Sequence, residues 1–422
     1  MNGHMDTLIE CDWLIVGAGP AGLFAAVTAA EHGNRVVIAE YLPSPGRKLL
    51  ASGSGKCNLT NLLAPNEMAE RFPGKGTARF VRPALLAFPP EALREWFRRR
   101  GVPVRAVDGF HCFPESERAR DVLDALLTAA NRLGVRLLSG TPVTGIETEN
   151  GRVSGAVASR LRFRTPRILI ATGGNGYPAL GGRGSGFELV RRTGHTIVEP
   201  VPALVGVRTS ASWPTRLAGM TLERVAARTT GKPAVESEGA LLFTHTGISG
   251  PAVLDLAGTL GRELLSAAET VMEVRWFPGI DPAGWLRQFS EWRTREGGRR
   301  LSSLLASRMN RRLADELAAQ AGVTACRAAE LPADRGDCLA RLLGAYPLKI
   351  RGTDGWEKAM ATSGGVARDE VRPNTLESRL VGGLYFAGET LDVDGRCGGY
   401  NLQWAFSSGR LAAEAGSRAD KS

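Results

Sequence analysis

A glycine turn lies near the start of the chain, in residues 12–40, DWLIVGAGPAGLFAAVTAAEHGNRVVIAE, and it restricts the fold more than any other segment. An apolar run indicates a strand, the turn follows, a helix of small residues ends at the glycine of EHGN, and a second apolar run indicates another strand. Gly17, Gly19 and Gly22 fit the pattern GxGxxG. The first makes the turn, the second lets a pyrophosphate approach the backbone, and the third lets helix and strand pack closely. This unit predicts a dinucleotide-binding, Rossmann-like domain.

The ends of this unit indicate how a dinucleotide would bind. The helix begins at Pro20 and Ala21, so the amide groups of its first turn would face the phosphate charge. Glu40 ends the second strand, 18 residues after Gly22. A carboxylate at this position accepts hydrogen bonds from ribose hydroxyls. It favours an adenosine ribose with free 2′ and 3′ hydroxyls, as in FAD or NAD, over a ribose with a 2′-phosphate.

Two later segments favour FAD over NAD. The first lies in residues 167–178 and the second in residues 382–416. Each contains an apolar run that ends in small residues. Flavoproteins with two dinucleotide folds use such strand ends beside the first glycine turn, one under the cofactor and the last with an acid for the ribityl chain. The residues assigned to these strand ends are Ala171, Thr172, Gly173, Gly388 and Glu389.

The loop after the last strand is expected at the flavin. Glu389, with Asp392 or Asp394, is the candidate for the ribityl chain. The helix that follows would direct its positive end at flavin N1 and the C2 carbonyl, where negative charge collects on reduction. A general acid role for Tyr400 and packing of Tyr400 against the ring both stay open. The residues assigned to the flavin edge are Asp394, Gly398, Gly399, Tyr400 and Asn401.

Residues 51–61, ASGSGKCNLTN, form a second glycine-rich turn with a lysine and a cysteine. A phosphate-binding P-loop needs a glycine five residues before its Gly-Lys pair and a hydroxyl directly after that pair. Leu50 and Cys57 stand at these positions, which disfavours a nucleotide triphosphatase. A dithiol mechanism needs a second cysteine a few residues on, and none follows Cys57. Cys57 is therefore either a small buried residue or a contact of the flavin.

We interpret this turn and the residues before it as a loop that approaches the flavin. Its two leading basic residues would lie near the phosphate or ribose, and its glycines would let the backbone approach the ring. The lysine and asparagine next to the cysteine are candidate donors to the flavin edge or the substrate, and the lysine is also a candidate catalytic residue. The residues assigned to the loop are Arg47, Lys48, Gly53, Gly55, Lys56, Cys57 and Asn58.

Five motifs occur in order along nearly the whole chain: GRKLLASGSGKCNLTN, ATGGNGYPALGGRGSG, LLFTHTGISGPAVL, MATSGGV and GLYFAGETLDVDGRCGGYNLQWAFSSG. Together they resemble the YhiN/BaiN-like flavoproteins, a group also labelled aminoacetone-oxidase-like. The resemblance implies one bound FAD, a Rossmann-like domain split by an insertion, and hydride or electron transfer through the flavin. It also implies that the MATSGGV turn, with Gly364 and Gly365, lies near the isoalloxazine ring.

The pattern changes between residues 197 and 356. Residues 203–277 alternate in short β runs, which predicts a small barrel or sandwich. Residues 281–345 have helical spacing and arginine-rich polar faces. We predict an α/β fold with three parts. These are a two-dinucleotide-binding FAD domain of residues 1–196 and 357–422, an inserted β-rich substrate domain of residues 197–280 and 346–356, and a helical subdomain of residues 281–345.

An inserted domain usually covers one face of the flavin and shapes the pocket for a small-molecule substrate. His245, in FTHTGISGP, is the candidate catalytic residue of this domain, because an imidazole can transfer protons near neutral pH. A histidine at a strand end is also a common structural hydrogen-bond donor, so both interpretations stay open.

Composition restricts the partners and the compartment. Of 422 residues, 43% are apolar and 23% charged, and the formal charge of +10 comes mostly from arginine. Runs such as REWFRRRG are more often solvated helix faces than nucleic-acid contacts, so nucleic acid is a disfavoured partner that charge alone does not exclude. The six cysteines lack metal-ligand spacing, which indicates reduced thiols, no metal site and a cytoplasmic protein. No segment predicts a membrane span.

We predict an FAD-dependent oxidoreductase that transfers a hydride through flavin N5. No second complete strand-GxGxxG-helix unit is present, so NAD(P)H would bind only transiently as electron donor. Two hypotheses stay open: reduction of a small enone-like acceptor with NAD(P)H, and oxidation of a small amine with oxygen. An RNA-binding or RNA-modifying flavoprotein and a non-enzymatic flavin-binding redox sensor are the alternatives. The sequence does not fix the oligomeric state.

Overall fold

The computed structural model describes residues 7–418, and the chain divides into two units. The first unit contains the chain up to Val201 and again from Ala359, and the second runs from Pro202 to Lys358. The second unit therefore interrupts the first.

The observed borders differ by a few residues from the predicted ones, which followed residue 196 and preceded residue 357. β12 (Ile197–Ala203) pairs with β19 (Ala361–Val366) in a two-stranded sheet, so most of β12 belongs with the first unit. The predicted β runs began at residue 203, so neither this strand nor its pairing with β19 was predicted from the sequence. The predicted helical subdomain, residues 281–345, lies within the second unit.

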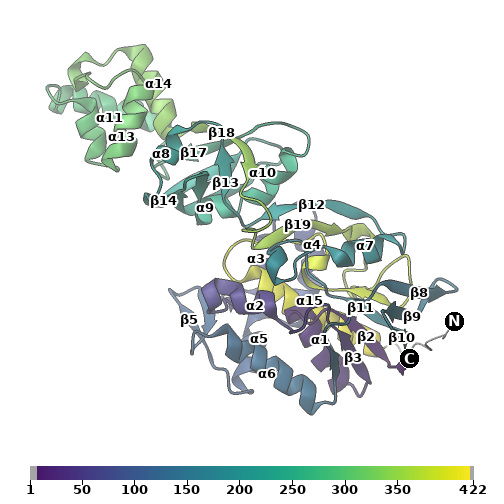
Figure 1. Cartoon of the computed structure of the whole chain (residues 1–422). Coiled ribbons are helices and arrows are strands. Elements are labelled where there is room, and N and C mark those ends of the chain that lie inside the picture. The colour runs from purple at the N-terminus through teal and green to yellow at the C-terminus, as the bar shows by residue number, and fades with distance from the viewer. Residues whose placement is uncertain (1–6, 419–422) are drawn as a thin grey trace. The chain divides into compact units, whose positions relative to one another are not determined.

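A parallel sheet of five strands forms the centre of the first unit (Figure 1). Its order is β20, β11, β2, β3, β7, and all its neighbouring strands are parallel. Sequences such as WLIV and VVIA form it because a parallel sheet covered on both faces needs continuous apolar runs. The bounds are β2 Trp13–Val16, β3 Val36–Ala39, β7 Arg136–Leu138, β11 Ile168–Ile170 and β20 Leu384–Phe386.

Two helices of small residues, α1 (Pro20–Glu31) and α15 (Tyr400–Arg418), pack against each other in this unit (Figure 1). Their close approach requires Gly409, where a Cβ would lie 2.3 Å from the Ala21 carbonyl oxygen. Because α1 follows β2 directly, its amino end lies at the carboxyl edge of the sheet. This is the edge at which open α/β sheets bind ligands.

Two smaller sheets complete the first unit, with strand orders β1, β10, β9, β8 and β4, β6, β5. Their strands are β1 Thr7–Glu10, β4 Thr60–Asn61, β5 Val104–Val107, β6 His111–Pro114, β8 Gly145–Glu149, β9 Arg152–Ala158 and β10 Leu161–Arg164. The other helices are α2 Arg47–Ala51, α3 Pro65–Glu70, α4 Thr77–Ala87, α5 Pro90–Arg98, α6 Ala119–Arg132 and α7 Ser185–Arg191.

Six strands of the second unit close into a barrel, in the order β13, β16, β15, β14, β17, β18. Of the two folds predicted for residues 203–277, the barrel is the correct one, and the returning segment provides the sixth strand. The strands are β13 Val207–Thr209, β14 Thr221–Thr229, β15 Glu236–Phe243, β16 Gly247–Ser249, β17 Thr270–Arg275 and β18 Tyr346–Thr353. Short helices accompany them at α8 Trp213–Arg216, α9 Pro251–Leu254 and α10 Ala257–Glu263.

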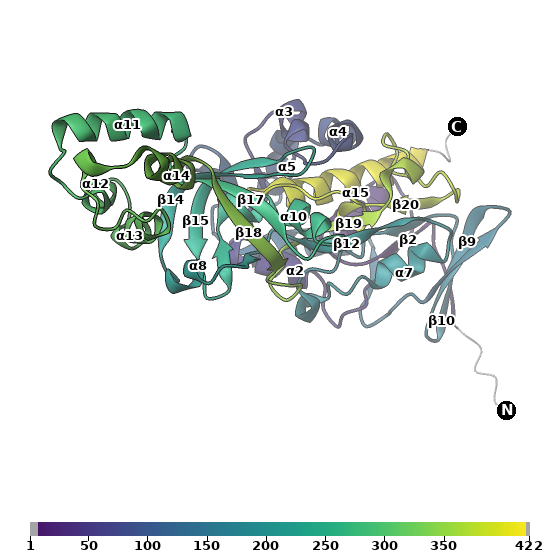
Figure 2. The same ribbon diagram turned by 90° about the horizontal axis from the view of Figure 1, so that it is seen from above.

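Helices α11 to α14 gather at one end of the second unit, beside the barrel strands (Figure 2). Trp285, Phe289 and Trp292 are buried and lie on one face of α11. The bounds are α11 Pro282–Arg295, α12 Leu301–Ala306, α13 Arg311–Gln320 and α14 Ala333–Gly344. Short 3₁₀ helices of the whole chain are Ser52–Gly55, Pro178–Leu180, Ala328–Glu330, Arg368–Glu370 and Gly388–Thr390.

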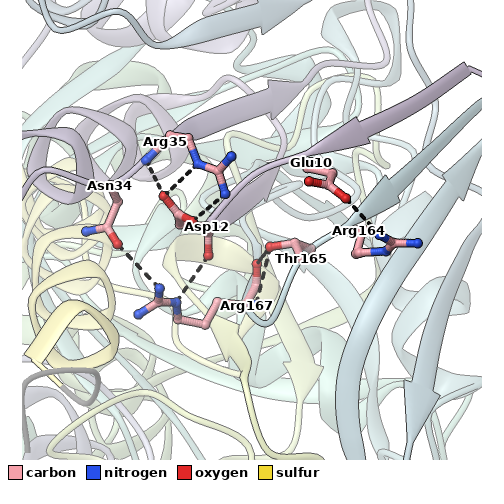
Figure 3. Close-up of polar contacts among 7 residues, drawn as sticks. All are labelled: Glu10, Asp12, Asn34, Arg35, Arg164, Thr165 and Arg167. Carbon is pink, nitrogen blue, oxygen red and sulfur yellow. Dashed lines mark hydrogen bonds and ion pairs between the residues drawn. The ribbon is translucent and has the colours of Figure 1, made fainter.

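A polar network holds the amino edge of the central sheet together (Figure 3). Arg167, directly before β11, donates to the Asp12 carbonyl at 3.1 Å, the Gly416 carbonyl at 2.6 Å and Asn34 Oδ1 at 3.3 Å. Arg35 Nη2 donates to Asp12 Oδ1 at 2.9 Å. These residues lie before strands or after helices. The network is therefore structural, and it lies at the edge opposite the glycine turn.

Of the six cysteines, Cys11, Cys57 and Cys112 are buried, Cys326 and Cys338 are partly buried, and Cys397 is exposed. Among residues 7–418, no helix has both the length and the apolarity that a membrane span needs. No three histidine, cysteine or acidic side chains of the same residues form a group that could hold a metal ion.

Candidate functional site

The glycine turn after β2 has the geometry that its three glycines predict. Gly17 has φ of 105°, and a Cβ there would lie 2.5 Å from the Ala171 carbonyl oxygen. A Cβ at Gly22 would lie 2.0 Å from the Gly17 carbonyl oxygen, so helix and turn meet only because this residue is glycine. A Cβ at Gly19 would meet no atom within 4 Å. The backbone at Gly19 is therefore open on the side where a side chain would stand, and α1 begins at the next residue, Pro20.

Glu40 holds this turn in place from the end of β3. Its carboxylate is only 8% exposed and accepts from the amide of Ala18 at 2.6 Å and from the amide of Leu42 at 2.8 Å. A carboxylate offers about four acceptor positions, so it can also accept from ribose hydroxyls. Its predicted role at the adenosine ribose is compatible with these bonds.

The ends of three strands meet at the carboxyl edge of the sheet. Ala171, Thr172 and Gly173 follow β11, and the first of them contacts the glycine turn. Gly388 follows β20 with φ of 67°, and a Cβ there would lie 3.1 Å from the Cβ of Ala21. Three of the residues that the sequence assigned to these strand ends, Ala171, Thr172 and Gly388, thus lie beside the glycine turn or the first turn of α1.

Lys48 and Glu389, both assigned to the cofactor from the sequence, form an ion pair. Lys48 Nζ lies 2.7 Å from Glu389 Oε2, and both side chains are largely buried. Glu389 Oε1 is buried and has no hydrogen-bond partner. Thr362 Oγ1 lies near this oxygen of Glu389. A Cβ placed at Gly174 would be 2.2 Å from Thr362 Oγ1 and 3.0 Å from Glu389 Oε1. Arg47 is the first residue of α2, directly before Lys48.

The MATSGGV segment forms the buried strand β19 and contacts the loop after β20. Ser363 Oγ donates to Asp394 Oδ1 at 2.8 Å. Gly365 has φ of 131°, and a Cβ there would lie 2.6 Å from the Thr390 carbonyl oxygen. Gly364 has φ of 116° and is equally close to a carbonyl oxygen of β12. Both glycines thus allow close backbone contacts, and their proximity to the isoalloxazine stays a prediction.

The glycine-rich turn of residues 51–61, which contains Lys56 and Cys57, packs against the glycines that precede α15. The side-chain amide of Asn58, oriented as its neighbours require, accepts from the Gly399 amide at 3.2 Å and donates to the Thr60 carbonyl at 3.0 Å. Asn61 Nδ2 donates to the Gly398 carbonyl at 2.9 Å. A Cβ at Gly399 would lie 2.5 Å from the Thr60 carbonyl carbon. Two segments more than 300 residues apart in sequence therefore form one surface.

The backbone of this turn is unusual at Gly53, Gly55 and Cys57, with φ of 55°, 87° and 63°. The Cys57 side chain is fully buried, and burial raises the pKa of its thiol to about 12. Such a thiol is not a thiolate near neutral pH. Of the two interpretations of Cys57, the structure favours the small buried residue. Lys56 Nζ lies 2.6 Å from the exposed Glu117, so its predicted catalytic role requires that this pair open.

Tyr400 and Asn401 stabilise the loop before α15. Tyr400 is 5% exposed and packs edge to face against Phe72, with centroids 5.9 Å apart. Asn401 donates to the Gly395 carbonyl at 2.9 Å and accepts from the Gly395 amide at 2.8 Å. His245 is exposed in the turn between β15 and β16 of the second unit. The catalytic roles of Tyr400 and His245 remain predictions.

Sequence reasoning missed His111, the first residue of β6. Its Nε2 would lie 3.2 Å from a Cβ at Gly398, and its Nδ1 lies 2.9 Å from Asp108 Oδ2. The pairing of β4 with β6 places His111 opposite Asn61. The Asp-Gly pair at residues 108 and 109 predicts a hairpin, but no pattern in the sequence connects that hairpin to the glycines before α15.

Three observations on the described residues fit FAD. The backbone at Gly19 has open space on the side where a pyrophosphate is expected. Glu389 Oε1 and Asn175 Oδ1 are buried acceptors without partners, as expected where a ligand supplies hydroxyl donors. The amino end of α15, with its partial positive charge, begins directly after the Gly398–Gly399 turn.

The chain matches one protein family, described as HI0933-like protein Rossmann domain, over residues 11–415. A 3-dehydro-bile acid delta(4,6)-reductase of Clostridium scindens is 32% identical to it, and the match covers 95% of this chain and 98% of that protein. A ribosomal RNA dihydrouridine synthase of Escherichia coli is 28% identical, over 96% of this chain and 97% of that protein. The protein of the same name in Haemophilus influenzae is 30% identical, over 95% of this chain and 97% of that protein.

Solved structures support the fold. A quinol-fumarate reductase with menaquinol molecules superposes with a TM-score of 0.52 at 18% identity, over 98% of this chain and 71% of that chain. The family match covers both units and confirms the resemblance found in the motifs. The chain belongs to the HI0933-like family, the YhiN/BaiN-like flavoproteins, and is an FAD-dependent oxidoreductase.

Proposed function

We propose that this chain reduces a carbon–carbon double bond conjugated to a carbonyl, with NAD(P)H as the electron donor. The main support is its similarity, over the lengths of both chains, to a protein named 3-dehydro-bile acid delta(4,6)-reductase. That name describes double bonds conjugated to a ring ketone. The relatives named ribosomal RNA dihydrouridine synthases imply reduction of the uracil double bond, which is also conjugated to a carbonyl. These names share one reaction class and favour a reductase over the small-amine oxidase.

When bound, FAD would supply the redox chemistry, which is hydride transfer from the nicotinamide to the double bond. The residues of the chain bind and orient the cofactor. The turn at Gly19 would receive the pyrophosphate, Glu40 the adenosine ribose, and Glu389 a ribityl hydroxyl. The amino end of α15 would stabilise negative charge at flavin N1 and the C2 carbonyl.

The test uses the purified protein with FAD, in the absence of oxygen. NADPH or NADH is added first, and a steroid with a double bond conjugated to a ketone second. We expect the visible flavin band to bleach and then return, and mass spectrometry to show a steroid product that has gained two hydrogen atoms. If a small amine bleaches the band and neither nicotinamide does so, the reductase proposal is wrong.

A second candidate substrate is a uracil base in RNA, and a basic segment of the first unit favours it. Residues 71–105 contain nine lysines and arginines but two acidic residues. Six of the nine basic residues form ion pairs with acidic side chains: Arg71, Arg82, Arg98, Arg99, Arg100 and Arg105. Lys75 and Arg79 are exposed. An exposed basic segment of this kind is typical of contacts with a phosphate backbone.

Salt dependence tests the RNA candidate. Each phosphate contact contributes about 0.7 to the slope of log affinity against log salt for single-stranded RNA. The double variant Lys75→Gln/Arg79→Gln should lower the slope by about 1.4 if both residues contact phosphates. Arg192→Gln on the surface after α7 is the matched control. RNA binding that ignores salt, or an unchanged slope in the double variant, would remove this segment as the RNA contact.

A further inference from the structure

Asp108 and His111 form a carboxylate–imidazole pair at the hairpin between β5 and β6. Asp108 has φ of 52°, a left-handed conformation that aspartate tolerates in tight turns. Its Oδ1 accepts from the amides of Phe110 at 3.2 Å and His111 at 3.1 Å, and its Oδ2 lies 2.9 Å from His111 Nδ1. The bonds from His111 lower the pKa of the Asp108 carboxyl. An ionised carboxylate only accepts, so the imidazole carries its hydrogen on Nδ1 and gains or loses a proton at Nε2.

The Nε2 edge of this imidazole faces the turn that precedes α15. A Cβ at Gly398 would lie 3.2 Å from Nε2 and 3.6 Å from Cδ2 of His111. Asn61, opposite His111 in the sheet, donates to the Gly398 carbonyl and fixes the turn against the hairpin. The side chains of His111 and Asp108 are 35% and 56% exposed. The pair therefore presents a site for one proton at the amino end of α15, where reduced flavin would concentrate its charge.

We propose that Asp108 and His111 compensate the charge of the reduced flavin, with His111 Nε2 taking up one proton as negative charge collects at flavin N1 and the C2 carbonyl. Hydride transfer brings two electrons and one proton to the isoalloxazine and leaves one negative charge there. The second proton comes from solvent and binds to Nε2, and no bond forms between histidine and flavin. The assignment rests on the FAD-dependent function above, but not on the identity of the donor or the acceptor.

Other charged groups also lie on the elements around the pair. Arg94 is on α5 beside Cys112, Arg396 is in the loop before α15, and Asp121 is at the start of α6. Arginine side chains are charged at any pH near neutrality, and aspartates ordinarily titrate well below this range. Because burial raises the pKa of Cys112, this thiol stays neutral there as well. Proton uptake coupled to flavin reduction in this range is therefore assigned to His111.

The test is the midpoint potential of FAD in the purified holoprotein, measured with a reducing system and indicator dyes at several pH values near neutrality. If reduction takes a proton to His111, the potential should fall more steeply with pH in the wild type than in His111→Gln. The two slopes should differ by about 30 mV per pH unit, because a tenfold change in the equilibrium constant of a two-electron couple shifts its potential by that amount. Asp108→Asn should change the slope in the same direction, because the neutral amide no longer supports the imidazolium.

The control is His32→Gln at the carboxyl end of α1, where Nδ1 lies 2.8 Å from the Thr28 carbonyl oxygen. This variant should retain the wild-type potential and slope. If His111→Gln fails to retain FAD, Asp108→Asn carries the test. Wild-type slopes in every variant that holds FAD would overturn the assignment. The reducing system with its dyes reduces the flavin without a nicotinamide. A failure of NAD(P)H to bleach the flavin band would therefore contradict the proposed electron donor but would not affect the measured potentials.

Discussion

Gly19 and Gly22 belong to one turn, but a side chain would meet different surroundings at each. A Cβ at Gly22 would lie 2.0 Å from a backbone oxygen, whereas a Cβ at Gly19 meets no atom within 4 Å. We expect Gly22→Ala to lower the free energy of unfolding by about 1–3 kcal/mol or more, as overpacked sites do. Gly19→Ala should leave the Tm of the FAD-free protein unchanged and weaken FAD binding, because the methyl group would occupy the path of the pyrophosphate.

Calorimetry of the FAD-free proteins and titration with FAD separate these two effects. The expected pattern is a low Tm for Gly22→Ala, and a normal Tm with a raised FAD Kd for Gly19→Ala. Wild-type FAD affinity in Gly19→Ala would show that the pyrophosphate does not lie at this turn.

Glu389 provides a second residue-scale prediction. One of its oxygens is bound by Lys48 and the other has no partner. Glu389→Gln keeps the shape but loses the charge, so the FAD Kd should rise about 10- to 100-fold, the loss expected for a hydrogen bond to a charged group. Glu188→Gln on the exposed face of α7 is the control and should bind FAD normally. Equal Kd values for the two variants would remove Glu389 from the cofactor site.

The cysteines differ in reactivity because they differ in burial. Cys57 is fully buried with a thiol pKa of about 12, whereas Cys397 is exposed. A thiol reagent applied to the native protein should label Cys397 and leave Cys57 unmodified, which mass spectrometry of peptides would show. Rapid labelling of Cys57, or loss of flavin reduction in Cys57→Ser with FAD still bound, would revive a redox role for this thiol.

At the scale of elements, a buried histidine joins the end of α7 to the segment before β20. Ser378 Oγ accepts from the amides of Leu380 and Val381 at 2.9 Å, so its hydrogen points to His195 Nε2 at 2.8 Å. His195 Nδ1 then donates to Thr193 Oγ1 at 2.9 Å. This arrangement requires a neutral imidazole. Burial lowers the pKa of His195 below its ordinary value of 6.5, although Glu370 raises it in part.

This pKa shift makes stability depend on pH. Because the folded-state pKa is lowered, the unfolded chain binds the proton more readily, and stability falls as the pH drops below 6.5. The Tm of the wild type should therefore decrease from pH 6.5 to about pH 5 more than that of His195→Gln. The variant should start lower, since it loses the two hydrogen bonds. Parallel Tm profiles in the two proteins would contradict the assignment.

The pairing of elements also explains what sequence reasoning found and missed. The positions of the glycine turn and of the strand ends follow rules of local spacing and were predictable, whereas the roles of the acids after them at the cofactor stay predictions. His111 was missed because only the pairing of β4 with β6 brings its hairpin to Gly398. The role of Asn401 in holding Gly395 was missed for a similar reason, because a motif identifies a loop but does not separate its contacts with ligand from those within itself.

At the scale of the whole molecule, the periodicity of apolar residues and the sequence motifs predicted an α/β domain interrupted by a β-rich and helical insertion. The choice between barrel and sandwich depended on whether β13 and β18 pair, a contact between residues about 140 apart in sequence that periodicity cannot show. The net charge of +10 likewise indicates an affinity for anions without naming one.

The most direct measurement is an anaerobic titration of the purified FAD-loaded protein with NADPH and with NADH, followed at the visible flavin band. We predict that one nicotinamide bleaches the band at a stoichiometry of one hydride per flavin, and that an acceptor with a double bond conjugated to a carbonyl restores it. A band that neither nicotinamide bleaches, or a protein that binds no FAD on reconstitution, would contradict the account.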